Sequence, residues 1–115
     1  MSYQKEHFNN ADRSKFLKAI AAEGVALSPY IKGLHTEPWV DHILSLKEYK
    51  TMYTPQRLVQ YREQALNLPK CDLVGQEMVV LGGSAQLLGT KADMDDVINA
   101  IMKVYENRDK LNAIE

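Results

Sequence analysis

The segment from Ser28 to His35 concentrates the side chains of this sequence that are best suited to binding a ligand. It combines the aromatic hydroxyl of Tyr30, the cation of Lys32, a flexible glycine and the imidazole of His35. Loops that mix such polar groups are common at binding sites. A surface loop that packs Tyr30 and Leu34 onto the core fits the same residues equally well. The sequence leaves both interpretations open.

The remaining polar residues have neither the spacing of a metal site nor that of a nucleotide site. The histidines at positions 7, 35 and 42 include no pair four residues apart, as a zinc-binding helix requires. The glycine-containing stretch Gly82–Lys91 resembles a phosphate-binding P-loop only in part, because Leu88 stands where the second glycine of that motif belongs. We therefore expect no metal ligands, and a bend that joins a strand to a helix at Gly82–Lys91.

Other candidate catalytic groups have simpler structural explanations. Asp93, Asp95 and Asp96 lie close together, but at the start of an expected helix they are better explained as partners of the helix dipole. Lys15 follows a serine, as Schiff-base lysines often do, yet it falls on the polar side of an amphipathic helix. Cys71 has no neighbouring histidine that would activate it. We therefore predict no catalytic residue and no cofactor-binding residue in this chain.

The first part of the chain is expected to fold as a helix followed by a strand. Asp12 suits the N-cap of a helix that runs to about Glu23. Gly24 stands where a left-handed C-terminal cap belongs. The apolar residues 25–27 then predict a short strand, which Pro29 ends. This strand leads into the candidate binding loop.

The middle of the chain is expected to be mainly helical. Pro38 and Pro55 each suit the first turn of a helix, where the missing N–H of proline costs nothing. Leu68-Pro69 ends the second of these helices, and Asp72 is expected to cap a short helical turn. The segment from Tyr49 to Tyr53 is expected to be irregular.

A strand and a long helix complete the pattern. Residues 78–81 are the clearest strand signal, and Thr90 with Asp93 forms a variant of the capping box. The last helix is expected to face the core with an apolar stripe made of Val97, Ile98, Ile101, Met102 and Tyr105. The predicted fold class is therefore α+β, with a small, mostly antiparallel sheet of two to four strands packed by about four helices.

Composition narrows the class of protein. A chain of 115 residues is expected to form one domain, and its net charge of −1 gives no electrostatic reason for binding nucleic acid or an anionic membrane. No apolar run approaches the roughly 18 residues of a membrane span, and no secretory signal is visible at the N-terminus. The single cysteine cannot form a disulfide within the chain, so a reducing, cytoplasmic compartment is expected.

Several segments occur in an order that is typical of one protein family. Arg13 to Val25 is an arginine-headed helix ending in Ala-Glu-Gly-Val, and Tyr30 to His35 is a loop with Tyr and Leu-His. A helical insert, Leu68-Pro69 and an apolar strand follow, and Leu87 to Asp96 reads Leu-Leu-Gly-x-x-x-Asp-Met-Asp-Asp. From Tyr3 to Asp109 the chain thus resembles the C-terminal small domain of the DegT/DnrJ/StrS sugar aminotransferases, in which the helical insert varies.

This resemblance implies a homodimeric, fold-type I enzyme that uses pyridoxal phosphate to transfer an amino group to a keto-sugar or cyclitol. In the family the Schiff-base lysine and the phosphate-binding residues lie in a large N-terminal domain, which residues 1–115 do not include. We therefore expect this chain alone neither to bind the cofactor nor to transaminate. In the family the small domain covers the substrate cleft. Tyr30 and His35 match its loop and are the expected substrate-facing residues, although Ser28-Pro29 stands where a glycine often precedes the tyrosine.

Two other functions remain open. A stand-alone interaction or ligand-binding domain would present to a partner the apolar surface that a large domain otherwise covers. A small independent enzyme would use His35 with a carboxylate. An unusually apolar exposed patch would favour the aminotransferase domain or the interaction domain over the independent enzyme. The expected partners are the large domain of the parent enzyme and a second subunit, with no nucleic acid and no membrane.

Overall fold

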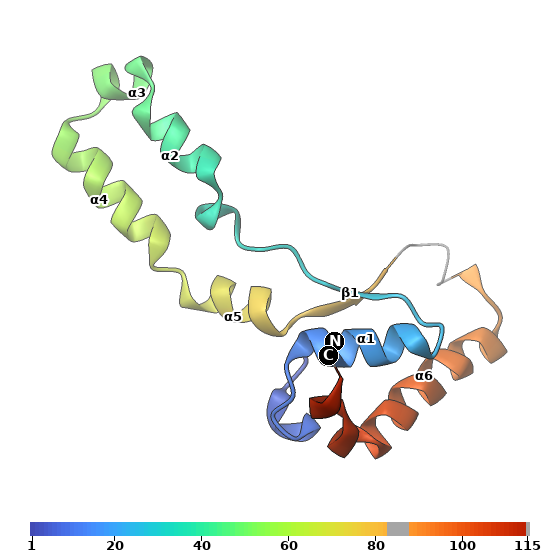
Figure 1. The fold of residues 1–115 in the computed structure, drawn as a ribbon. Helices are drawn as coiled ribbons and strands as arrows, with labels where there is room; N and C mark the ends of the chain where they lie inside the picture. The colour runs from blue at the N-terminus through green and yellow to red at the C-terminus, as the bar shows by residue number, and fades with distance from the viewer. Residues whose placement is uncertain (83–87, 115) are drawn as a thin grey trace. The chain divides into compact units, whose positions relative to one another are not determined.

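The structure is a computed structural model that describes residues 1–82 and 88–114. Most of the bend expected within Gly82–Lys91 lies outside these described residues. The described residues form six α-helices and one sheet of two antiparallel strands (Figure 1). This arrangement confirms the predicted α+β class. No helix in the described part of the chain combines the length and the apolar character needed to cross a membrane.

The chain folds into two compact units. The first unit contains Met1–Tyr30 and Glu77–Glu115, and the second contains Ile31–Gln76. The second unit is thus one continuous segment inserted between the two parts of the first. The expectation that residues 1–115 act as a single domain stays a prediction.

The first unit contains a short antiparallel sheet. Strand β1 (Leu27–Pro29) pairs with β2 (Val79–Leu81). At the opposite edge of β2, an isolated bridge joins Ser2 to Met78. The N-terminal residues therefore satisfy backbone groups of β2 that β1 does not reach, which is how an exposed strand edge is protected from unwanted pairing.

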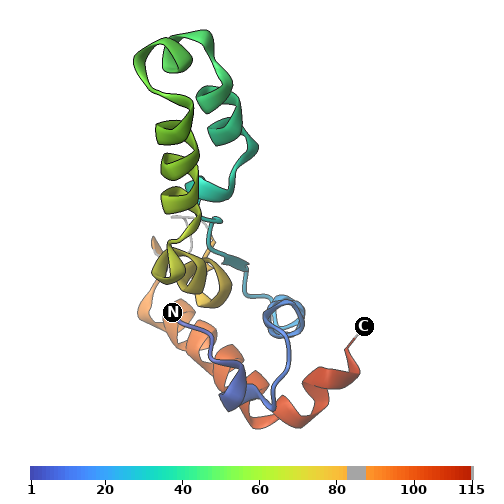
Figure 2. The same ribbon diagram turned by 90° about the vertical axis from the view of Figure 1, so that its left-hand side faces the viewer.

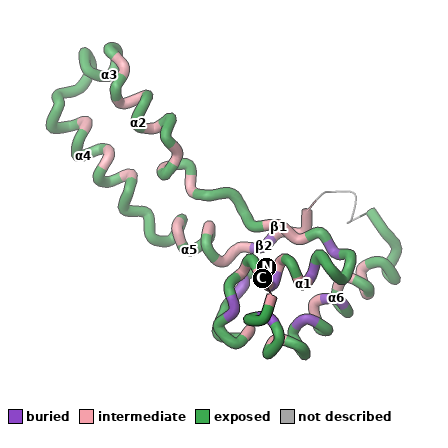
Figure 3. Tube along the Cα trace, in the orientation of Figure 1, coloured by how far each residue is buried: buried purple, intermediate pink, exposed green. Residues whose placement is uncertain are grey.

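Two helices build the core of the first unit. Helix α1 (Arg13–Ala22) packs against α6 (Lys91–Glu106) and against β1. Phe16 and Ile20 of α1 are four residues apart on one helical face, and both are fully buried. Figure 3 shows that the buried residues fall in this unit. They are Tyr3, Ala11, Phe16, Ile20, Val25, Val79, Ala100, Val104 and Leu111.

The predicted helix ends are largely confirmed. Gly24 follows α1 with φ of 85°, a left-handed conformation that glycine adopts without strain. Thr90 and Asp93 form the capping box of α6, in which each side chain bonds the other residue's backbone N–H. Hydrogen bonds from the hydroxyl and the backbone N–H of Thr90 lower the pKa of Asp93. Asp12 occupies the N-cap position of α1, but its side chain makes no capping hydrogen bond.

The apolar stripe predicted for α6 is only partly correct. Val97 and Ile101 pack against the core as expected. Ile98 and Met102 are instead 56% and 49% exposed. Each follows a packed residue directly, and one residue rotates the side chain by about 100° around the helix, away from the core. Tyr105 is 38% exposed and contacts an aromatic ring of the core edge-on.

The second unit, in which every residue is described, is mainly helical. Its elements are a 3₁₀ turn η2 (Leu34–Thr36) and helices α2 (Pro38–Ser45), α3 (Lys47–Met52), α4 (Pro55–Leu66) and α5 (Pro69–Glu77), the last of which ends just beyond it. Helices α2 and α4 run side by side in opposite directions, and α3 joins them (Figure 2).

Two sequence-based expectations for this unit are wrong. The segment from Tyr49 to Tyr53 lies mostly within α3 rather than in an irregular stretch. No glycine or proline interrupts residues 47–52, so nothing in the local chemistry stops a helix there. Asp72 does not cap a helix, because α5 already begins at Pro69.

Candidate functional site

His35 is held in the second unit by an acidic partner. Its Nε2 atom lies 3.0 Å from Oδ1 of Asp72, in α5. The His35 side chain is only 8% exposed, whereas that of Asp72 is 42% exposed. Because an ionised carboxylate only accepts hydrogen bonds, Nε2 carries the hydrogen of this contact. The carboxylate therefore fixes the orientation of the imidazole, as orienting carboxylates do for histidines in functional sites.

Gly33 makes room for this imidazole. A Cβ atom placed on Gly33 would lie 2.5 Å from Nδ1 of His35, closer than real Cβ atoms come to other atoms. The sequence suggested that this glycine gives the loop backbone freedom. The structure gives it a different role, which is to let the backbone approach the His35 ring.

Arg62 joins three elements around the same histidine. Its Nε lies 2.6 Å from Oδ1 of Asp41, and its Nη2 donates to Oδ2 at 2.8 Å. Its Nη1 donates to the backbone carbonyl of His35 at 2.8 Å. Two parallel bonds to one carboxylate make use of the planar fork of the guanidinium, which lysine lacks. Arg62 thus ties α4 both to α2 and to the turn that carries His35.

An apolar groove, here called the α2–α4 groove, opens beside His35. Its volume is about 450 Å³, within the range of small-molecule binding clefts. Trp39, Tyr49 and Tyr61 contribute aromatic walls. The other lining residues are Leu34, His35, Val40, Ile43, Leu44, Gln64, Ala65 and Leu68. A smaller hollow of about 190 Å³ also has Tyr49 and Tyr61 in its lining, together with Leu44, Tyr53, Arg57 and Leu58.

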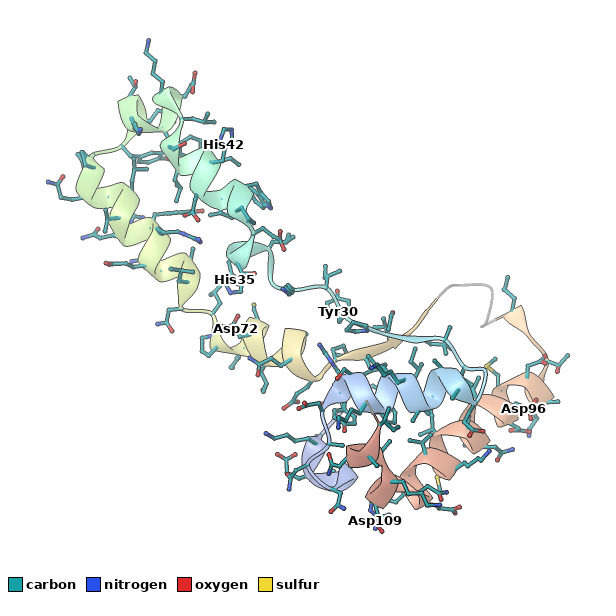
Figure 4. All side chains as sticks on the ribbon, viewed as in Figure 1. Tyr30, His35, His42, Asp72, Asp96 and Asp109 are labelled. Carbon is teal, nitrogen blue, oxygen red and sulfur yellow. The ribbon has the colours of Figure 1, made fainter. Side chains whose placement is uncertain are left out.

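Tyr30, the other residue expected to face substrate, belongs to the first unit. It follows β1 directly, and its backbone N–H donates to the carbonyl of Met78 at 3.1 Å. Its side chain is 46% exposed, and Leu34 is 62% exposed, so neither residue is packed into the core as the alternative interpretation required. Ser28 and Pro29 form part of β1. Tyr30 and His35 lie in different units (Figure 4), and their shared surface stays a prediction.

The other candidate groups have structural roles. Asp93 completes the capping box of α6, and Asp95 pairs with Lys91 at 2.6 Å. Their position at the helix start agrees with the expected role as dipole partners. Cys71 is exposed. Within residues 1–82 and 88–114 no group of three histidine, cysteine or acidic side chains is placed to hold a metal ion.

The arrangement around His35 is better suited to binding and orienting a ligand than to nucleophilic catalysis. A nucleophilic site needs a hydroxyl or thiol bonded to the imidazole, with the carboxylate on its far side. In the part of the chain that the structure describes, the hydrogen bonds of the His35 ring reach Asp72 and no hydroxyl or thiol. Asp72, Asp41 and Arg62 were missed by sequence reasoning, because their partners lie 37 and 21 residues away along the chain.

Comparisons with family models, with curated proteins and with solved structures find no match for this chain. The aminotransferase resemblance therefore stays a prediction that rests on the sequence segments themselves.

Proposed function

We propose that this chain is the C-terminal small domain of a pyridoxal-phosphate-dependent sugar aminotransferase of the DegT/DnrJ/StrS type. Its role in the parent enzyme is to cover the cleft in which an amino group passes to a keto-sugar or cyclitol. The chain is not catalytic alone, and the proposal places it in the cytoplasm within a homodimer. The large domain supplies the cofactor and the catalytic lysine.

One observation carries this proposal. The first and last segments that resemble the family, Arg13 to Val25 and the apolar strand with Leu87 to Asp96, lie far apart in the sequence, yet they belong to one unit with β1 beside β2 and α1 against α6. The helical insert that varies in the family lies in the second unit, where most of the Tyr30–His35 loop precedes it and Leu68-Pro69 follows it. Segments with a common origin as one domain are expected to pack together in this way.

Arg13 supports the same interpretation. It heads α1 in the arginine-led helix of the resemblance, and its Nη1 donates to the backbone carbonyl of Met78 at 3.0 Å. This bond fastens the start of α1 to the residue before β2. An arginine at this position thus joins the first segment of the motif set to its apolar strand.

The residues of this chain do not fit a Schiff-base site for pyridoxal phosphate. A Schiff-base lysine is activated by removal from water. No lysine in residues 1–82 and 88–114 is buried. Lys15, the candidate with the suggestive serine neighbour, donates its Nζ proton to the carbonyl of Asn112 at 2.8 Å. In the proposal the cofactor is accordingly held by the large domain.

The proposal is tested on the protein isolated from its source cells with an antibody against residues 1–115. We expect the isolated protein to be a longer polypeptide that transfers an amino group from glutamate or glutamine to a keto-sugar. In that enzyme, Tyr30→Phe and His35→Ala should raise KM for the sugar while the cofactor spectrum stays the same. An isolated protein of the same size as this chain, without transferase activity, would overturn the proposal.

A stand-alone interaction domain is the second candidate function. The observation that favours it is the exposure of apolar side chains in the second unit, in which no residue is buried. Contiguous exposed apolar surface usually marks an interaction site. The same isolation from source cells separates the two candidates, because an interaction domain would be recovered with a bound protein and without pyridoxal phosphate.

A further inference from the structure

The second unit has an apolar face but no core of its own. Residues 31–76 are all described, and none of them is buried (Figure 3). Trp39, Tyr49 and Tyr61, which line the α2–α4 groove, remain 49%, 36% and 52% exposed. Helices of globular proteins are stabilised mainly by burying an apolar face against another element. The groove is therefore expected to be covered in the functional protein.

The aromatic rings that line the α2–α4 groove and the smaller hollow, which share Tyr49 and Tyr61, offer apolar area of the order needed for one side of a stable protein interface. Trp39, Tyr49, Tyr53 and Tyr61 are between 36% and 52% exposed. An aromatic side chain presents about 150–250 Å², so these four rings leave on the order of 300–450 Å² uncovered. A standard interface buries about 800 Å² on each partner, of which a little over half is apolar. Aromatic residues are also the commonest binding hot spots.

The charges of the second unit are divided between its two ends. Around α3 and the start of α4, here called the tip, three cations stand against one anion: Lys47, Lys50 and Arg57 against Glu48. The remainder of the unit, here called the base, has four anions against three cations: Glu37, Asp41, Glu63 and Asp72 against Lys32, Arg62 and Lys70. The tip is thus positive and the base slightly negative.

This distribution fits a second copy of the chain in one orientation. An antiparallel, two-fold pairing places the positive tip of each copy on the slightly negative base of the other. A parallel pairing would bring like charges together, which costs affinity. Two-fold homodimers are the commonest oligomers, and pairs of helical hairpins form four-helix bundles with a shared core.

We propose that the α2–α4 groove is the docking site for the second unit of another copy of this chain, packed antiparallel around a two-fold axis. The aromatic rings of the two grooves form the shared core, and the charged ends fix the orientation. The inference rests on the second unit alone and holds whether or not the chain belongs to an aminotransferase.

The first test compares two substitutions on α4 in the full chain. Tyr61→Glu places a charge in the groove, whereas Val59→Glu places the same charge on the same helix at a residue that is 58% exposed and does not line the groove. Sedimentation velocity over a concentration series gives the dimer dissociation constant. Interfaces of this size bind with micromolar or tighter constants, so a dimer is expected above about 10 μM.

Tyr61→Glu should raise the dissociation constant at least thirtyfold, roughly the loss of one hot spot, and Val59→Glu should change it less than about threefold. Circular dichroism checks that both variants keep their helices. A wild-type chain that remains monomeric at about 100 μM overturns the proposal. The proposal is also overturned if Tyr61→Glu and Val59→Glu both fold and weaken the dimer equally, or if both fold and leave it unchanged.

The second test examines the orientation and retains every aromatic contact. Arg57→Glu at the tip and Glu37→Arg at the base should each weaken the dimer about tenfold, because each acts at two symmetric places. The double variant should recover to within about threefold of the wild type. Additive losses in the double variant contradict the antiparallel docking. This test also decides whether the second units dock in an antiparallel pair if Tyr61→Glu loses its helical signal in circular dichroism.

Discussion

Arg62 on α4 holds Asp41 on α2 in a two-point ion pair, with Nε and Nη2 each bonded to a different carboxylate oxygen. The third bond of Arg62, to the carbonyl of His35, extends the pair to the turn η2. His35 in turn is hydrogen-bonded to Asp72 on α5. The side chains of Arg62 and His35 therefore connect four elements of the second unit: α2, α4, η2 and α5. In a unit without buried apolar residues, these polar contacts carry much of the structural specificity.

Arg62→Lys should destabilise the second unit, because lysine keeps the charge but cannot bond both carboxylate oxygens and the His35 carbonyl at once. We expect a loss of about 1–2 kcal/mol in the free energy of unfolding, measured by denaturant titration. Arg57→Lys on the same helix is the matched control and should change stability by less than about 0.5 kcal/mol. Equal effects of the two substitutions would contradict the role given to Arg62.

Gly33→Ala should displace the His35 ring, because the added Cβ would lie 2.5 Å from Nδ1. The imidazole then loses its contact with Asp72, and the NMR signals of the His35 ring should shift. Gly75→Ala is the control, since its Cβ would meet only ordinary contacts at 3.9 Å. Within helix α5 that change should stabilise by up to about 1 kcal/mol. Unchanged His35 signals in Gly33→Ala would contradict the close approach.

The capping box of α6 should make stability depend on acid pH. Hydrogen bonds from Thr90 hold the pKa of Asp93 below its ordinary value. The ionised carboxylate is thus favoured in the folded state, and its contribution is present above about pH 4 and lost as pH falls through the folded pKa. Thr90→Ala should cost about 1 kcal/mol at neutral pH. Its difference from the wild type should shrink below pH 4, and a difference independent of pH would contradict this account.

Tyr3 should make stability depend on alkaline pH. Burial raises the pKa of Tyr3 to about 12, and its hydroxyl donates to the carbonyl of Ala11 at 2.7 Å. The neutral phenol is favoured in the folded state, so its contribution is present below about pH 10 and lost as pH rises toward 12. Tyr3→Phe should cost about 1 kcal/mol at neutral pH and lack this alkaline loss. Identical pH profiles for the two proteins would be the contrary result.

Local signals in the sequence predicted much of the first unit, although β1 covers Leu27–Pro29 rather than residues 25–27, and Pro29 pairs within the strand rather than ending it. The left-handed turn at Gly24 and the cap formed by Thr90 and Asp93 depend on neighbours within four residues, so their spacing is sufficient to identify them. The apolar pattern identified α6, but it did not show that Ile98 and Met102 lie outside the contact with α1. Burial depends on which part of a helix face meets a partner, and residue type alone does not determine that.

The contacts of the candidate site could not be predicted from the sequence. His35 was selected for its chemistry, but Asp72 lies 37 residues further along the chain, and Arg62 acts across 21 residues on Asp41. Such pairs are formed when helices pack, and no local spacing distinguishes their members from other surface charges. Tyr30 and His35 belong to different units, and the surface they are expected to share stays a prediction.

The central proposal, that this chain is the small domain of a pyridoxal-phosphate enzyme, is tested most directly by locating the cofactor. The protein immunopurified from its source cells is reduced with borohydride, which fixes pyridoxal phosphate to its lysine, and peptides are mapped by mass spectrometry. We predict one pyridoxyl-lysine in a polypeptide segment outside residues 1–115, covalently continuous with them. A native protein without any pyridoxyl-lysine, or with the label on a lysine of this chain, would contradict the account.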